Sequence, residues 1–412
     1  MKIVFCAFDG KNIINGINAW LLRLLPSLSA NGIDITVLFI AWAREDECTI
    51  IPILREAGVR CIVIPAPHYS ERIVKWILEY LILHQPDIFV ANHMPQALYA
   101  TKWLSLNEVS TVMVLHNDDD EYSALVEEFL TKAEQAKISA VIPVSTILYN
   151  KIEHFKDSVL VKRIPYGAPV PLSKAKFPKK GPFKLAYVGR IVKKQKNIDT
   201  VTKAFCEIAI HNPDIEANIY GSGPDEGIVN DILKHYGNPT NVFFNGNLSS
   251  EKVEEKLLAS HIFVLMSDFE GIPVALMEAM SCGVVPICKR IESGIPELIV
   301  NSKTGFFIDD IEDLISKVIL LKNTPEAWEK MSNNARNLIE KSFSTDNNNT
   351  EWFKLLQELK PKSKIKSFNI PHNLKLPAVH QQLESHDIRE PSFTKKIRKK
   401  IKLYLDILLS RS

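Results

Sequence analysis

The first 168 residues alternate short runs of β-branched and aromatic residues with longer segments of helical periodicity. Apolar residues recur at three- and four-residue spacing over 18–30 and 73–84, as in amphipathic helices that cover a sheet, and Gly32 is placed to end the first of them. This alternation predicts an α/β fold with a parallel sheet between two layers of helices. The predicted strands are 3–8, 35–40, 61–64, 88–91, 111–116 and 140–144.

The pattern stops at the segment Gly-Ala-Pro-Val-Pro over 167–171, and a stretch containing lysines and prolines follows to Pro182. Such composition is typical of an interdomain linker. A second alternation then predicts strands and helices, and two α/β halves imply a cleft that the carboxyl ends of their strands face. The strands are 183–188, 216–220, 242–245, 262–266 and 284–289, and the helices are 198–211, 252–259 and 274–281.

Composition agrees with two globular cores, because the chain has 412 residues of which 46% are hydrophobic and 24% charged. Six cysteines occur without a Cys-x-x-Cys pair, which favours reduced thiols in a cytoplasmic protein. The N-terminal run has no cleavage pattern, and the longest apolar stretches are shorter than the roughly 20 residues that span a bilayer. We therefore expect a soluble, cytoplasmic chain.

The segment 267–286 carries two glutamates, Glu270 and Glu278, eight positions apart. A predicted strand leads into a Gly/Pro turn and then a helix that starts near Pro273, whose first backbone N–H groups can face an anion or a hydroxyl. Glu270 then lies in the turn and Glu278 inside the helix, so the two carboxylates can accept hydrogen bonds from separate parts of one ligand. A dipole partner and a solvated acid are the ordinary alternatives, but Glu278 lies between Met277 and Ala279, and acids are rarely buried without a partner.

These motifs resemble the retaining GT-B glycosyltransferases known as glycosyl transferases group 1, or family four. The acid-x7-acid element and the following Glu-Ala-Met-x-x-Gly run carry the resemblance over 183–310. The further matches are Tyr187-Val-Gly-Arg190, Tyr220-Gly-Ser-Gly-Pro224, Phe244-Asn-Gly246, and Glu297-Leu-Ile before Thr304-Gly-Phe.

The resemblance implies a GT-B fold of two Rossmann-like domains with parallel sheets that face a central cleft. We expect an acceptor domain over 1–170, a linker over 171–182, a nucleotide-sugar domain over 183–342, a helical segment over 343–361 that returns across the cleft, and a tail over 362–412. Glu278 would bind the donor ribose and Glu270, as a catalytic residue, the transferred sugar. The other expected donor-binding residues around the turn and the loops are Gly271, Ile272, Pro273, Val274, Gly16 and Gly246.

A donor diphosphate requires cations or oriented amides. The loop after strand 183–188 supplies Arg190 and Lys196, and the related enzymes place a phosphate-binding Arg and Lys in this loop. Lys193 and Lys194 are interpreted as solvated. No obligatory metal or other cofactor is expected, and the run Asp118 to Asp120 is interpreted as a helix cap rather than a metal-binding Asp-x-Asp pair.

The N-terminal half resembles the family less closely. Gly16 precedes a helix where related enzymes carry a Gly-rich loop near the donor phosphates, although a simple turn glycine is the alternative. His116 ends a strand on the cleft side and is expected to contact the sugar or handle protons, with a polar strand end as the alternative. His93 ends the preceding strand, and the sequence favours neither a functional nor a structural role for it.

We expect transfer of a hexose-type residue from an NDP-sugar, with retention of configuration, to a saccharide or lipid-linked acceptor in surface polysaccharide or glycan synthesis. A nucleotide-sugar epimerase of similar architecture and a non-catalytic sugar-nucleotide-binding protein are the alternatives. A dinucleotide oxidoreductase is disfavoured because neither half has a Gly-x-Gly-x-x-Gly fingerprint.

The C-terminal tail is strongly basic. From Lys362 it holds twelve Lys or Arg and four Asp or Glu, a net charge of +8 in a chain of net charge +2. Residues 392–411 place Phe393, Ile397, Ile401, Tyr404 and Leu408 at helical spacing among lysines, as in helices that lie on anionic membranes. Docking on the protein itself and partner binding are the alternatives, and nucleic acid is not an expected partner.

Overall fold

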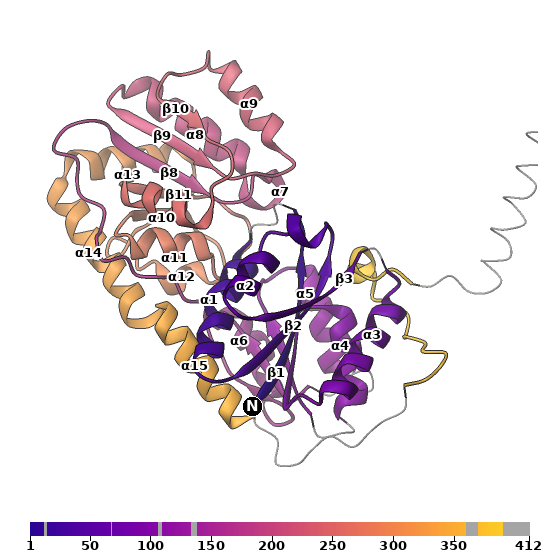
Figure 1. The fold of residues 1–412 in the computed structure, drawn as a ribbon. Helices are drawn as coiled ribbons and strands as arrows, with labels where there is room; N and C mark the ends of the chain where they lie inside the picture. Colours follow the sequence, from indigo (N-terminus) through magenta and orange to yellow (C-terminus); the bar gives the residue numbers. More distant parts are fainter. Residues whose placement is uncertain (12–14, 67, 106–108, 133–137, 360–369, 390–412) are drawn as a thin grey trace, which may run out of the picture.

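The computed structural model describes residues 1–11, 15–66, 68–105, 109–132, 138–359 and 370–389. Its strands form two separate parallel sheets, one in an N-terminal lobe (residues 1–167) and one in a C-terminal lobe (residues 183–342). Helices lie on both faces of each sheet, and the lobes stand one above the other in Figure 1. The predicted fold of two Rossmann-like halves is therefore confirmed.

The sheet of the N-terminal lobe has seven strands in the order β3-β2-β1-β4-β5-β6-β7. Its central strands are apolar on both faces because helices cover both, and β4 and β6 are buried throughout. The strands are β1 Lys2–Asp9, β2 Asp34–Ala41, β3 Arg60–Pro65, β4 Ile88–Asn92, β5 Ser110–Leu115, β6 Ala140–Pro143 and β7 Leu160–Val161. The helices are α1 Gly16–Ala30, α2 Ile51–Glu56, α3 Ser70–His84, α4 Pro95–Ser105, α5 Asp120–Val126 and α6 Thr146–Ile152.

The sheet of the C-terminal lobe has six strands in the order β10-β9-β8-β11-β12-β13. The strands are β8 Phe183–Val188, β9 Ile215–Tyr220, β10 Val242–Phe244, β11 Ile262–Leu265, β12 Val285–Lys289 and β13 Phe306–Ile308. The helices are α7 Lys193–Lys196, α8 Ile198–His211, α9 Glu226–His235, α10 Ser250–Leu258, α11 Val274–Ser281, α12 Ile295–Leu298, α13 Ile311–Asn323 and α14 Pro325–Ser342.

Every predicted strand is present, with bounds that differ by two residues at most. The two missed strands, β7 and β13, are two and three residues long, which is too short to show a period in the sequence. In both sheets the first strand lies in the interior, and the strand order runs outward from it first to one edge of the sheet and then to the other. Such a topology opens a crevice at the carboxyl ends of the neighbouring strands.

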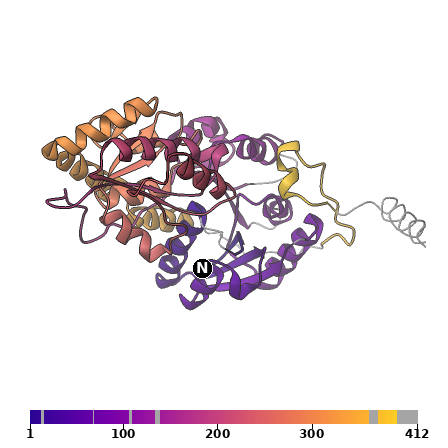
Figure 2. The ribbon, with the colours of Figure 1, turned by 90° about the horizontal axis from the view of Figure 1, so that it is seen from above.

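The chain crosses between the lobes twice, and the two crossings lie side by side. Ala168 N donates to Phe343 O (2.9 Å), and Thr345 N donates to Ala168 O (2.9 Å). Beyond this point α15 (Thr345–Glu358) returns to the N-terminal lobe and packs against α1. Figures 1 and 2 show α14 and α15 running along one side of both lobes. The predicted returning helix is thus present.

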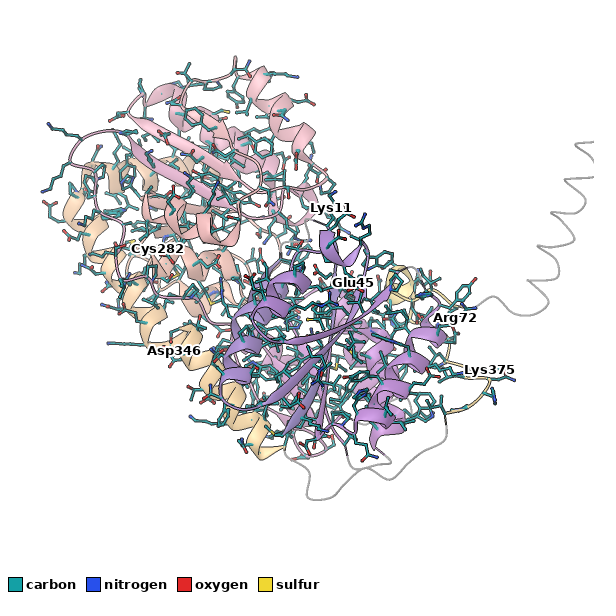
Figure 3. All side chains as sticks on the ribbon, viewed as in Figure 1. Lys11, Glu45, Arg72, Cys282, Asp346 and Lys375 are labelled. Atoms are coloured by element: carbon teal, nitrogen blue, oxygen red, sulfur yellow. The ribbon has the colours of Figure 1, made fainter. Side chains whose placement is uncertain are left out.

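The segment 370–389 lies on the N-terminal lobe, and its regular structure is one short 3-10 helix, η4 (Gln381–His386). Leu383 is fully buried, Ser70 N donates to Ile388 O (2.7 Å), and the Arg389 guanidinium lies 5.2 Å from the centre of the Tyr99 ring. Lys375, in this segment, is labelled on the N-terminal lobe in Figure 3. These few contacts hold the segment on the N-terminal lobe, although its sequence has little periodicity.

The predicted basic helix 392–411 lies outside the described residues. Among the residues that are described, no helix is both long enough and apolar enough to cross a bilayer.

The return of α15 depends on Trp352, which is 1% exposed and lies beside Trp20 of α1 and Phe5 of β1. We predict that Trp352→Ala lowers the free energy of unfolding by about 3–5 kcal/mol, because it leaves a large cavity. The control is Trp42→Ala, since Trp42 is 56% exposed and its loss should change stability by less than about 0.5 kcal/mol. Chemical denaturation of both variants measures the difference, and equal losses would contradict this role of Trp352.

Candidate active site

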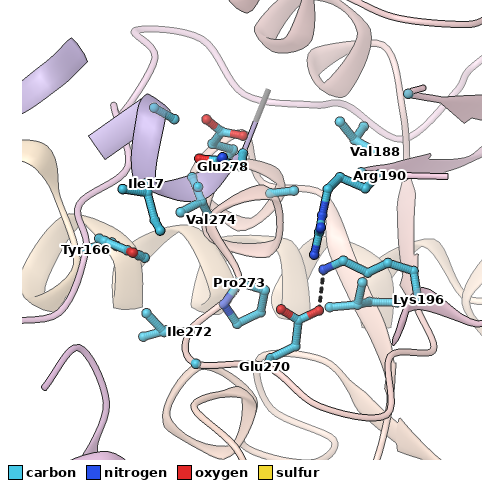
Figure 4. A pocket seen from close by; sticks show the side chains of 18 of the residues that line it. Ile17, Tyr166, Val188, Arg190, Lys196, Glu270, Ile272, Pro273, Val274 and Glu278 are labelled. Atoms are coloured by element: carbon cyan, nitrogen blue, oxygen red, sulfur yellow. Dashed lines mark hydrogen bonds and ion pairs between the residues drawn. The ribbon is translucent and has the colours of Figure 1, made fainter. Parts of the chain in front are cut away.

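A cavity of about 360 Å³ lies between the two lobes, at the carboxyl ends of their central strands. Its size is in the range of small-molecule sites. Both lobes line it, and Figure 4 shows side chains from α1 and from the C-terminal lobe facing the same space. The predicted residues that line it are Gly16, His116, Arg190, Lys196, Glu270, Gly271, Ile272, Pro273, Val274 and Glu278.

Glu270 lies in the loop between β11 and α11 and is 6% exposed. Its carboxylate forms an ion pair with the Lys196 ammonium, drawn as a dashed line in Figure 4. Lys196 ends α7, and Asn197 then takes a left-handed conformation at the start of α8, which fixes the direction of the lysine. Gln195, which the sequence did not single out, ties the two loops together because its side-chain amide donates to Phe269 O (3.0 Å).

Arg190 follows β8 and points in Figure 4 toward Lys196 and Glu270. Its guanidinium donates to the Gln195 side-chain oxygen, and its own carbonyl accepts from the Tyr187 hydroxyl (2.7 Å). The two cations therefore converge on one wall of the cavity. Lys193 and Lys194 are exposed and do not line it, in agreement with their interpretation as solvated residues.

Glu278 lies within α11 and lines the same cavity. Its partner comes from the other lobe, since the Arg23 guanidinium of α1 forms an ion pair with the Glu278 carboxylate. Arg23 also donates to Gly167 O (3.1 Å). The sequence indicated that a buried Glu278 needs a partner but could not identify Arg23, which lies 255 positions away with no motif around it.

Gly271 brings the C-terminal lobe against the end of β5. A Cβ atom at this position would lie 1.9 Å from His116 O, so a side chain would push the lobes apart. Gly16, predicted to lie before a helix, is the first residue of α1, and a Cβ there would lie 2.9 Å from Val274 Cγ2. Both glycines therefore permit contact between the lobes.

Two other predictions about this region need adjustment. Pro273 caps α11, which begins at Val274, so the proline is one position before the helix. Gly246 is not among the lining residues, although its carbonyl accepts from Gly221 N (2.7 Å) and supports the loop behind the cavity.

His116 is 5% exposed, and both its ring nitrogens are bonded within the N-terminal lobe. The Asn92 side-chain oxygen can only accept, so Nε2–H donates to it, and Nδ1 accepts from the Tyr166 hydroxyl. Burial lowers the pKa of His116 well below its usual value, so the ring is neutral. His93 lies beside it edge-on, with ring centres 5.2 Å apart, but does not line the cavity.

The run Asp118 to Asp120 is a helix cap, as predicted. The Asp119 side chain accepts from Tyr122 N (3.1 Å) at the start of α5, and Asp118 forms an ion pair with Lys151 (2.5 Å). Within the described part of the chain no three His, Cys, Asp or Glu side chains gather to hold a metal ion.

Comparison with known proteins finds similarity to glycosyltransferases. Residues 171–338 match the family model described as Glycosyl transferases group 1. A protein of Escherichia coli (strain K12), named provisionally as the colanic acid biosynthesis glycosyltransferase WcaL, is 25% identical over 293 residues, or 66% of this chain and 71% of that protein. The N-acetyl-alpha-D-glucosaminyl L-malate synthase of Bacillus anthracis is 29% identical over 156 residues, or 37% of this chain and 40% of that protein.

Solved structures show the same fold at lower identity. Anabaena HepE in complex with UDP has a TM-score of 0.68 at 16% identity, covering 87% of this chain and all of that one. The sucrose-phosphate synthase of Thermosynechococcus elongatus has a TM-score of 0.71 at 17% identity, covering 87% of this chain and 98% of that one. The chain thus has the GT-B fold. Its C-terminal lobe matches the model of the group 1 glycosyltransferases, which confirms the resemblance found in the sequence.

The contact at Gly271 gives a prediction about the closed site. We expect Gly271→Ala to lower activity at least about a hundredfold, because misplacement by about 1 Å has effects of this size. Gly227→Ala is the matched control, since a Cβ at Gly227 in α9 meets no atom within 4 Å and should leave activity unchanged. Steady-state kinetics of both variants measures this, and wild-type kinetics in Gly271→Ala would show that the contact is dispensable.

Proposed function

We propose that this protein transfers a sugar from a nucleoside-diphosphate sugar to a saccharide or lipid-linked acceptor, with retention of configuration. The observation that supports it best is the arrangement in one interlobe cavity of two cations, Arg190 and Lys196, and two acids, Glu270 and Glu278. Two cations on one wall suit a diphosphate, and two acids suit separate sets of hydroxyl groups.

In this proposal the diphosphate lies against Arg190 and Lys196, near the loop that precedes α11. Glu278 accepts hydrogen bonds from the ribose hydroxyls, and Glu270 from hydroxyls of the transferred sugar. Gly271 to Val274 line the sugar end of the cavity, where backbone N–H groups at the start of α11 are available to an anion. Gly246 supports the base end from behind.

The chemical step then proceeds by positioning and charge stabilisation. The C–O bond between the sugar and the diphosphate breaks, and an oxocarbenium-like centre forms. The acceptor hydroxyl attacks on the face from which the diphosphate leaves, and its proton passes to an oxygen of the departing diphosphate. Arg190 and Lys196 offset the charge of the departing diphosphate, so no metal is required. His116, neutral and held by Asn92 and Tyr166, presents a fixed ring edge and its backbone to the sugar rather than carrying a proton.

The biological role that we propose is synthesis of a surface polysaccharide or related glycan. Two names of relatives support it: WcaL of E. coli is assigned to colanic acid biosynthesis, and a Bacillus subtilis relative is named poly(glycerol-phosphate) alpha-glucosyltransferase. The acceptor would enter from the N-terminal lobe, whose loops at the sheet edge complete the cavity.

The first experiment is a thermal-shift screen with UDP, GDP and ADP, followed by a transfer assay with the matching nucleotide sugars in EDTA. Donor binding to the folded state raises the apparent melting temperature, and we expect transfer to persist without divalent metal. Absence of any nucleotide binding would contradict the proposal, and conversion of the donor without an acceptor would favour an epimerase.

The two acids should have separable effects. We predict that Glu278→Gln raises the donor Kd at least about tenfold with a small effect on kcat, because it weakens bonds to the ribose. Glu270→Gln should lower kcat by about a hundredfold or more with a smaller change in Kd, because its bonds strengthen at the reacting sugar. Glu292→Ala, an exposed acid outside the cavity, is the control. Wild-type kinetics in both Gln variants would remove the proposed roles.

The tail gives a separate prediction, because its lysines surround an apolar stripe. We propose that residues 392–411 bind anionic membrane surface, where each Lys or Arg contributes about 1 kcal/mol. Full-length protein should sediment with vesicles containing anionic lipid at low salt and less at high salt, because screening weakens exposed charges. The 1–391 protein and neutral vesicles are the controls, and equal sedimentation of both proteins would exclude membrane binding by the tail.

A further inference from the structure

Glu278, the expected ribose ligand, is held by a residue of the opposite lobe. The Arg23 guanidinium of α1 donates through Nη2 to Glu278 Oε1 and through Nη1 to Gly167 O (3.1 Å). Both side chains of the pair are largely shielded, with 21% and 17% of their surfaces exposed. Salt screens such a shielded ion pair only slightly, and breaking it costs more free energy than breaking an ion pair on the surface.

The geometry leaves one carboxylate oxygen for a ligand. Glu278 Oε1 is taken by Arg23, whereas Oε2 has no hydrogen-bond partner among the described residues. Arg23 cannot follow the carboxylate freely, because its second nitrogen is anchored at Gly167, where the chain crosses between the lobes. A planar guanidinium with two fixed bonds therefore sets the rotamer of Glu278. Both residues line the cavity.

We propose that Arg23 is a positioning residue for the donor, which it serves through Glu278. It holds the Glu278 carboxylate so that Oε2 faces the ribose hydroxyls, and it does so only while the lobes are in contact. Ribose binding and closure of the lobes therefore stabilise each other. This inference rests on the proposed function, because it needs a nucleotide in the cavity.

A second interlobe ion pair provides a matched control. Arg163 of the N-terminal lobe pairs with Glu297 of α12, and the Glu297 carboxylate also accepts from Thr146 N. Neither Arg163 nor Glu297 lines the cavity. Loss of this pair weakens contact between the lobes without touching the ribose ligand.

The experiment measures binding of two nucleotides to four proteins, and of the ribonucleotide to Glu278→Gln with and without Arg23→Ala. The first nucleotide is whichever of UDP, GDP and ADP binds the wild-type protein most tightly, and the second is its 2′,3′-dideoxy form, which lacks both ribose hydroxyls. Isothermal titration gives the Kd of each for the wild type, Arg23→Ala, Arg23→Lys and Arg163→Ala. Thermal unfolding of each variant checks that it is folded, and if Arg23→Ala does not fold, Arg23→Lys is compared in its place.

We expect Arg23→Ala to raise the Kd of the ribonucleotide about tenfold and that of the dideoxy nucleotide less than about twofold, because only the first depends on an oriented Glu278. Arg23→Lys should raise the ribonucleotide Kd by less than Arg23→Ala does, since one ammonium cannot hold both Gly167 and Glu278. Arg163→Ala should change both Kd values by the same factor. In the Glu278→Gln background, Arg23→Ala should change the ribonucleotide Kd less than about twofold.

Two results would overturn the inference. Equal effects of Arg23→Ala on both nucleotides would make Arg23 a general interlobe contact, and tighter ribonucleotide binding would make it a competitor of the donor. Failure of the proposed function is recognised separately, because the wild-type protein would then bind none of the three nucleotides.

Discussion

Contact between the lobes at Gly271 is the constraint on which the candidate site depends. The loop between β11 and α11 passes so close to the end of β5 that a Cβ atom would lie 1.9 Å from His116 O. Glu270 lies just before this contact, and Glu278 lies beyond it in α11. Both acids line the cavity, and Glu278 also pairs with Arg23 of the N-terminal lobe.

Four charged side chains of the cavity are held in two ion pairs. Lys196 with Glu270 lies within the C-terminal lobe, and Arg23 with Glu278 spans the two lobes. A buried charge is costly when it loses its partner, so each pair fixes the direction of both side chains. The pair within one lobe makes a rigid wall. The pair between lobes makes the orientation of Glu278 depend on where the N-terminal lobe lies, and this difference is the basis of the role inferred for Arg23.

The framework that permits such contact is the double crossing of the chain. The bonds between Ala168 and residues 343 and 345 join the outgoing and returning segments, and Trp352 then anchors α15 beneath Trp20. Trp20 in turn lies beside His116, with ring centres 5.4 Å apart and ring planes tilted by 57°. The returning helix is therefore connected through buried rings to the residue against which Gly271 closes, and a change in its packing reaches the cavity wall.

The sequence by itself determined the periodic parts of this protein. Alternation of strands and helices specified two doubly wound sheets, and Glu270, Glu278, Arg190 and Lys196 were identified because each lies at a fixed distance from a strand end within a motif. The sequence did not identify Arg23, Gln195, Asn92 or Tyr166, since each acts on a residue distant in the chain or through a contact that no local pattern encodes. The same holds for segment 370–389, which Leu383 and a few hydrogen bonds fix on the N-terminal lobe. The spacing of residues within one helix, strand or motif predicts the structure of that element. The partner of a buried charge or ring is decided only when distant elements pack together.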